Sequence, residues 1–155
     1  MSVQGSESPW AHRSRAREAA VQMLYQIEVG QLTLVEASRI HGIVGAPEIA
    51  GLDEDAHRYA VVLARGASED RVAIDERIAD AARNWRVERM TVLDRTVLRL
   101  AVHELIGHPE TPPRVVIDEA IELARRYSGE EAARFVNGVL DGVFHALKEQ
   151  GKIAE

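Results

Sequence analysis

Three arginines near the start of the chain have side chains suited to binding a nucleic acid. Arg13, Arg15 and Arg17 lie in a stretch from Pro9 to Ile27 whose only other charged residue is Glu18. Guanidinium groups pair with phosphate oxygens and stack on bases. Arg13 and Arg17 stand four residues apart, which places them on one face of a helix, and Arg15 projects from another side. The pattern indicates a small phosphate-binding site, with a solvated charged face as the alternative.

A second candidate site lies on the last predicted helix, residues 130–149. The stripe predicted to be buried consists of Ala132, Val136, Val139, Val143 and Leu147. Gly138 falls on the outer face, although a glycine costs about 1 kcal/mol in a helix interior. Phe135 and Gly142 fall on one edge of the stripe. A helix face without a side chain at Gly138 indicates that RNA, a partner or a neighbouring helix lies close to the helix backbone there. Arg134 beside a half-exposed Phe135 suits a phosphate and a stacked base.

Motifs for metal binding and catalysis fail on spacing. A zinc protease needs histidines four apart on one helix face, whereas His103 and His108 are five apart. The pair formed by Glu54 and His57 is the only Glu-x-x-His, and a di-iron bundle needs two. The sequence has no Gly-x-Ser-x-Gly elbow and no phosphate-binding Gly-x4-Gly-Lys loop. The carboxylates of one later segment are explained by a solvated helix face: Asp118, Glu119 and Glu122. We therefore expect no enzyme, no metal and no cofactor.

The helix that must position these sites is predicted at 91–106, TVLDRTVLRLAVHELI. Its apolar residues cover an arc of roughly 200°, far wider than the stripe of a surface helix. Thr91 is a good N-cap, and Asp94 three residues later approximates a capping box. Gly107 and Pro109 end the helix. A helix of this kind is packed from at least two directions, so we expect it at the centre of a helical domain.

Helical periodicity covers most of the remaining chain, and no segment alternates long enough to predict a strand. Residues 53–82 keep one apolar register through Gly66, which favours a single long helix. Residues 42–52 predict an irregular connector, because they hold three glycines and a proline. The sequence predicts an all-α protein with helices at 9–29, 33–40, 53–82, 87–90 (a single turn), 91–106, 113–127 and 130–149.

Composition narrows the class of protein further. The 155 residues carry a net charge of −6, which argues against a general nucleic-acid binder and makes the local arginine cluster more informative. There is no cysteine, so disulfides and thiolate metal sites are excluded. No apolar run approaches the ~18 residues of a membrane span, and the N-terminus lacks the pattern of a signal peptide. We expect a cytoplasmic protein.

Three segments resemble the NusB family of transcription antitermination factors. They are AREAAVQMLYQIE at 16–28, LDRTVLRLAVHEL at 93–105 and VIDEAIELARRYSGEEAARFVNGVLD at 116–141. The resemblance implies a seven-helix, all-α bundle of two helical subdomains, about three helices plus four, at approximately 9–82 and 86–149. It implies binding of single-stranded boxA RNA together with the ribosomal protein NusE. RNA polymerase and other Nus factors complete the complex, which transcribes ribosomal RNA operons processively.

The same resemblance assigns residues to surfaces. RNA-binding residues would be Arg13, Arg15, Arg17, Glu131, Arg134, Phe135, Asn137 and Gly138. The surface facing NusE would include Tyr25, Glu88 and Asp94. The resemblance allows a homodimer and implies no membrane partner. The alternatives are a NusB-like module in ribosomal RNA processing or modification, and a protein–protein scaffold without an RNA role.

Overall fold

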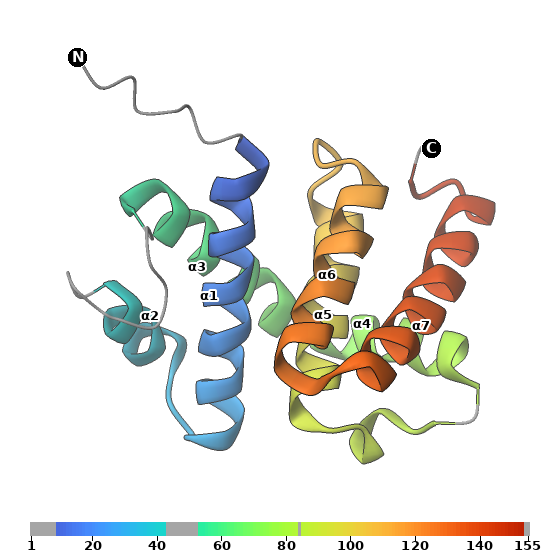
Figure 1. The fold of residues 1–155 in the computed structure, drawn as a ribbon, viewed down its shortest axis with the longest axis horizontal. Helices are drawn as coiled ribbons and strands as arrows, with labels where there is room; N and C mark the ends of the chain where they lie inside the picture. The colour runs from blue at the N-terminus through green and yellow to red at the C-terminus, as the bar shows by residue number, and fades with distance from the viewer. Residues whose placement is uncertain (1–8, 43–52, 84, 154–155) are drawn as a thin grey trace.

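The computed structural model describes residues 9–42, 53–83 and 85–153, and this part of the chain is helical without a strand (Figure 1). It contains seven α helices and one 3-10 turn, which confirms the all-α prediction. Their bounds are α1 Pro9–Val29, α2 Leu34–Gly42, α3 Glu54–Glu69, α4 Arg71–Ala82, η1 Val87–Arg89, α5 Val92–Gly107, α6 Pro113–Ser128 and α7 Glu130–Glu149. The predicted connector at 42–52 lies outside the described residues apart from Gly42, which ends α2. Among the described helices, none combines the length and the apolar character needed to cross a bilayer.

Helix α5 lies at the centre of the fold, as its wide apolar arc predicts. It packs against α1, α3, α4, α6 and α7, and eight of its residues are buried. The hydroxyl oxygen of Thr91 accepts a hydrogen bond from the Asp94 backbone N–H at 3.1 Å, so the predicted N-cap is confirmed. On the polar side, Arg95 is paired with Glu28, and Arg99 is paired with Asp75 at 2.7 Å.

The prediction of one helix over 53–82 is wrong, because the chain breaks at Asp70. The Asp70 N–H still donates to the carbonyl of Gly66, and its own carbonyl accepts from Ile74, so the helical hydrogen bonding is nearly continuous. The two parts pack on different neighbours: α3 lies mainly against α1, and α4 lies against α5 and α7. A straight helix would not reach both surfaces. An apolar register that continues across a bend does not reveal the bend.

Gly66 is not the break, and α3 continues through it. A Cβ at Gly66 would lie 2.1 Å from the ring of His103 on α5. The glycine therefore admits the imidazole at the place where α3 crosses α5.

The helices gather in two groups, with α1, α2 and α3 on one side of Figure 1 and α5, α6 and α7 on the other. The subdomain limits 9–82 and 86–149 stay a prediction. The packing of α4 against α5 and α7 favours a division near Asp70 instead, which would give three helices and then four with α4 in the second group.

Candidate nucleic-acid interface

The three arginines of α1 have different environments. Arg13 lies with its guanidinium carbon 4.1 Å from the ring centre of Tyr59, and one of its nitrogens is 3.9 Å from a Glu110 oxygen. Arg13 and Arg15 are partly exposed, whereas Arg17 is only 2% exposed. Two of the three side chains are therefore accessible to a phosphate.

The surface position predicted for Arg17 is wrong. Its Nε donates to Glu104 Oε1 at 2.7 Å, and Nη2 donates to Glu104 Oε2 at 2.6 Å, in a pair of which both members are buried. The Tyr59 hydroxyl donates to the same carboxylate at 3.0 Å. Burial opposes the charge of Arg17, but hydrogen bonding and attraction to Glu104 outweigh it and raise the pKa of Arg17. Arg17 thus joins α1 to α5 and contacts no solvent ligand.

A sequence signal for this pair exists on α5 and not on α1. Glu104 is a carboxylate within the apolar arc of the central helix, between residues that must be buried. A carboxylate in that position needs a cation from another element, because an unpaired buried charge is very costly. Arginine supplies a bidentate partner for it.

The predicted patch on α7 lies mainly at the surface. Arg134, Asn137 and Gly138 are exposed, and Phe135 is half-buried. Apart from its chain neighbours and the adjacent backbone of α7, no described atom lies within 4 Å of a Cβ built at Gly138, so its outward position is confirmed. Gly142 differs, because its Cβ would lie 3.2 Å from Ala81 Cβ on α4. The two glycines therefore differ: Gly142, on the edge of the stripe, admits a neighbouring helix, and Gly138, on the outer face, is open.

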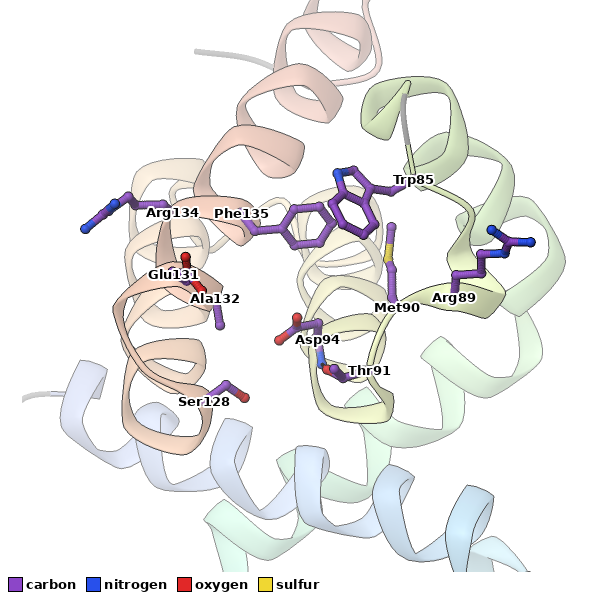
Figure 2. A pocket seen from close by; sticks show the side chains of 10 residues that line it. All are labelled: Trp85, Arg89, Met90, Thr91, Asp94, Ser128, Glu131, Ala132, Arg134 and Phe135. Carbon is purple, nitrogen blue, oxygen red and sulfur yellow. Dashed lines mark hydrogen bonds between the residues drawn. The ribbon is translucent and has the colours of Figure 1, made fainter.

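Phe135 forms one wall of a cavity of about 660 Å³ between the start of α7, η1 and the start of α5 (Figure 2). Its ring meets Trp85 edge to face, with the ring centres 5.8 Å apart. The lining residues are Trp85, Arg89, Met90, Thr91, Asp94, Ser128, Glu131, Ala132, Arg134 and Phe135. The fold therefore brings Glu131, Arg134 and Phe135, predicted to bind RNA, together with Asp94, predicted to face a partner. Trp85 and Arg89 are additional members that the sequence reasoning missed.

Asp94 extends its carboxylate into this cavity (Figure 2). Burial raises the pKa of Asp94 above its ordinary value, and a hydrogen bond between the Asp94 side chain and Thr91 opposes that shift. Oδ1 is buried and has no hydrogen-bond partner among the described residues. This oxygen is enclosed by neighbouring protein atoms, which accounts for the effect of burial on the Asp94 carboxyl group.

The other predicted partner residues lie elsewhere. Glu88 lines a second cavity, of about 900 Å³, formed by α4, η1, α5 and the end of α1. Tyr25 is exposed on α1 and lines neither cavity. Trp85 lines both cavities and stands between them.

The α1 surface and the α7 surface are connected through the end of α6. Glu18 of α1 accepts hydrogen bonds from Tyr127 at 2.6 Å and from Arg126 at 2.9 Å. Helix α7 begins at Glu130, directly after Gly129, whose φ of +100° favours glycine. This short turn joins the end of α6, which is hydrogen-bonded to α1, to the first residues of α7.

His103 of α5 and His108, the residue that follows the helix, lie in packing contacts. In residues 9–42, 53–83 and 85–153, no group of three or more His, Asp or Glu side chains is placed to hold a metal ion. The rings of His103 and His108 lie edge to face with centres 5.2 Å apart, and His108 meets Tyr59 in the same way. These histidines are packing partners in the α3–α5 contact.

The helical bundle and its open surface of guanidinium and aromatic groups define an all-α protein with a candidate binding site at the start of α7. The NusB family model matches residues 14–145. The transcription antitermination protein NusB of Sorangium cellulosum is 47% identical over 135 residues, covering 87% of this chain and 93% of that protein. The chain belongs to the NusB family.

Solved structures agree with this assignment. NusB of T. maritima has a TM-score of 0.74 and 35% identity, and the match covers 91% of this chain and 97% of that one. A crystal structure of the antitermination factors NusB and NusE in complex with dsRNA gives a TM-score of 0.73 at 28% identity. That match covers 88% of this chain and 98% of the other.

Proposed function

We propose that this chain is a transcription antitermination factor that binds boxA RNA together with NusE and supports processive transcription of ribosomal RNA operons. The observation that carries the proposal is the family match over residues 14–145. The structural similarity of the chain to a NusB that was crystallised with NusE and dsRNA supports the proposal that it binds both RNA and NusE. The chain would act in the cytoplasm by assembling a complex, without catalysis.

Two exposed surfaces would contact the RNA. On α1, Arg13 and Arg15 would bind phosphates. Arg17 holds α1 against α5 through its pair with Glu104. On α7, Arg134 and Phe135 would bind a phosphate and a base, flanked by the remaining predicted residues, Glu131, Asn137 and Gly138. NusE would bind near Tyr25, Glu88 and Asp94, beside η1 and the end of α1.

Electrostatics explain why a partner is needed. The chain carries a net charge of −6, and several arginines are already paired with carboxylates. A protein that neutralises few phosphates releases few counterions and binds RNA weakly. A second protein that shares the RNA would supply the additional phosphate neutralisation.

Binding of boxA RNA, measured with and without NusE over a range of salt concentrations, tests this function. We expect weak binding alone and tighter binding with NusE. Replacing Arg13 and Arg15 with alanine should weaken binding and flatten the salt dependence, by about 0.7 in log–log slope for each phosphate that the variant no longer neutralises. Arg39→Ala, at an exposed site on α2, is the matched control and should leave both quantities unchanged.

One result would contradict the proposed function, and two others would contradict the assignment of its surfaces. If the unaltered protein with NusE binds boxA RNA no better than a scrambled RNA, the antitermination role fails. If the Arg13/Arg15 variant keeps the unaltered affinity and slope, the α1 surface is not the phosphate site. Tyr25→Ala should weaken NusE association without changing RNA binding by the isolated protein, and equal loss of both would contradict separate surfaces.

A further inference from the structure

Arg13 is held against α3 although part of its side chain is exposed. Its guanidinium carbon lies over the face of the Tyr59 ring, 4.1 Å from the ring centre. Nη1 is buried and forms no hydrogen bond with a described residue, and a Glu110 oxygen is 3.9 Å from it. The side chain is nevertheless 33% exposed, so the part that reaches solvent belongs to its other atoms. One of the predicted phosphate-binding residues of α1 therefore has a defined orientation.

The aromatic ring, rather than the carboxylate, fixes this orientation. A distance of 3.9 Å is too long for a hydrogen bond, and the Glu110 side chain is 56% exposed, so water weakens its attraction for Arg13. A guanidinium group over an aromatic face is attracted by the ring quadrupole, and the planar group packs on the planar ring. Tyr59 thus provides the contact that orients Arg13 most strongly.

Tyr59 is itself fixed by the buried polar cluster that joins α1, α3 and α5. Its hydroxyl donates to Glu104 Oε2 at 3.0 Å, and the same carboxylate accepts two hydrogen bonds from Arg17. The ring of His108 meets the Tyr59 ring edge to face, with the centres 5.6 Å apart. Burial and the nearby charge of Glu104 raise the pKa of Tyr59, so the hydroxyl keeps the proton that it donates. The ring beneath Arg13 therefore has little freedom to turn.

The surface beside this pair is hollowed. A cavity of about 280 Å³ lies between α1 and α3, the two helices that carry Arg13 and Tyr59. Its lining residues are Arg13, Ala16, Asp55, Arg58, Tyr59 and Val62. Arg58, the other cation of this cavity, is paired on its own helix with Asp55 at 3.1 Å and with Glu54 at 3.5 Å. Arg13, unlike Arg58, forms no hydrogen bond with a described carboxylate, so a phosphate does not have to displace one.

We propose that Tyr59 is a positioning residue for RNA binding: its ring holds the Arg13 guanidinium in place for an RNA phosphate, and its hydroxyl ties that ring to the buried Arg17–Glu104 pair. The inference rests on the proposed RNA function, in which Arg13 binds a phosphate, and it adds a role for a residue that need not touch the RNA. An arginine fixed before binding loses less conformational freedom when the phosphate arrives, so the affinity is higher. Stacking of a base on this face of Tyr59 is disfavoured, because Arg13 already covers it.

Affinity for boxA RNA in the presence of NusE measures this effect. Tyr59→Leu removes the aromatic face and should weaken binding about two- to fivefold, the factor that corresponds to a cation–π contact at an exposed site. Tyr59→Phe keeps the face, and its affinity should stay within about twofold of that of the unaltered protein. Because Arg13 keeps its charge in both variants, the salt dependence should stay unchanged. Arg13→Ala, in contrast, should flatten it by about 0.7 in log–log slope for one lost phosphate contact.

A double-mutant cycle separates positioning from a general effect on the fold. In the Arg13→Ala background, Tyr59→Leu should cause no further loss of affinity, since no guanidinium group is left to orient. Circular dichroism must show each variant to be folded at the temperature of the binding assay. Phe144→Leu, which changes a half-buried aromatic side chain on α7, is the matched control. Glu110→Gln tests the neighbouring carboxylate, and neither of these two changes should weaken binding.

The unaltered protein offers a test that needs no variant. The Nε–H group of Arg13 should have an NMR order parameter in the free protein well above that of Arg39, an exposed arginine of α2, because Arg13 is stacked on a ring. Equal mobility of the two side chains would overturn the positioning role, even if Tyr59→Leu does not fold.

The remaining outcomes separate the inference from the function beneath it. If Arg13→Ala weakens RNA binding while Tyr59→Leu keeps the unaltered affinity, the role of Tyr59 is wrong and the RNA function stands. If Tyr59→Leu costs as much affinity in the Arg13→Ala background as in the unaltered protein, Tyr59 does not act through Arg13 and the proposal is overturned. A loss with Glu110→Gln and none with Tyr59→Leu would assign the positioning to the carboxylate instead. If the unaltered protein with NusE binds boxA RNA no better than a scrambled RNA, both the function and the inference fail.

Discussion

Removing Arg17 should destabilise the protein far more than removing any surface arginine. Arg17→Met keeps most of the side-chain volume but leaves Glu104 as a buried carboxylate, 1% exposed, with only the Tyr59 hydroxyl to donate to it. Breaking one partner from a buried pair costs about 3–5 kcal/mol, a large part of the roughly 5–15 kcal/mol that stabilises a domain. Arg13→Met, at a partly exposed site, is the control. Apart from the loss of the contact between Arg13 and the Tyr59 ring, it should change the free energy of unfolding by less than about 0.5 kcal/mol.

A double-mutant cycle measures the pair itself. Glu104→Met should cost less than Arg17→Met, because Glu119 lies 4.0 Å from Arg17 and gives it a second carboxylate. The double variant replaces two buried charges with apolar side chains, which is often neutral or stabilising, so its loss should be well below the sum of the single losses. Urea unfolding followed by far-ultraviolet circular dichroism gives all four free energies.

The reasoning would be refuted by small and additive losses. If Arg17→Met changes the free energy of unfolding by less than about 1 kcal/mol and the cycle shows no coupling, Arg17 is not in a buried pair. Arg17→Lys separates charge from geometry, since lysine keeps the charge and loses the bidentate hydrogen bonding. Its stability should fall between that of the unaltered protein and that of Arg17→Met.

The two glycines of α7 should respond differently to alanine. Gly138→Ala should raise the free energy of unfolding in urea by up to about 1 kcal/mol, because its new Cβ meets no atom of another element within 4 Å. Gly142→Ala should raise it less, because its new Cβ would lie 3.2 Å from Ala81 Cβ. An equal gain at both would contradict the packing of α7 on α4. Gly66→Ala should lower the melting temperature, because its Cβ would lie 2.1 Å from the His103 ring, and His103→Ala in the same chain should restore it; no restoration would place the strain elsewhere. Burial and the neighbouring His108 lower the pKa of His103, so the unfolded chain binds its proton more readily. The contribution of His103 is therefore present above the ordinary pKa of about 6.5 and is lost as the pH falls towards the lowered value. Urea midpoints at several pH values should show a steeper acid loss for the unaltered protein than for His103→Gln, and parallel curves would refute this.

Local signals in the sequence determined where the helices lie. Thr91 and the wide apolar arc after it predicted α5 with its cap, and Gly30 and Ser128-Gly129 marked helix ends within a residue of those observed. Capping and helical periodicity act over a few residues, so they can be read without knowing the neighbours. The same locality explains the prediction that Gly138 faces outward, which depends only on its angle to the buried stripe of its own helix.

Tertiary structure alone decided that Arg17 is buried and that Trp85 meets Phe135. Arg17 looked like a member of a surface cluster, but its partner Glu104 lies 87 residues later in the chain. The ring of Trp85 meets Phe135 of α7 because the fold brings the corner after α4 against α7. The break at Asp70 accompanies the packing of α3 and α4 on different helices. Helical periodicity places Glu104 within a buried arc, but it does not identify the cation that pairs with it, because that contact joins segments far apart in the chain.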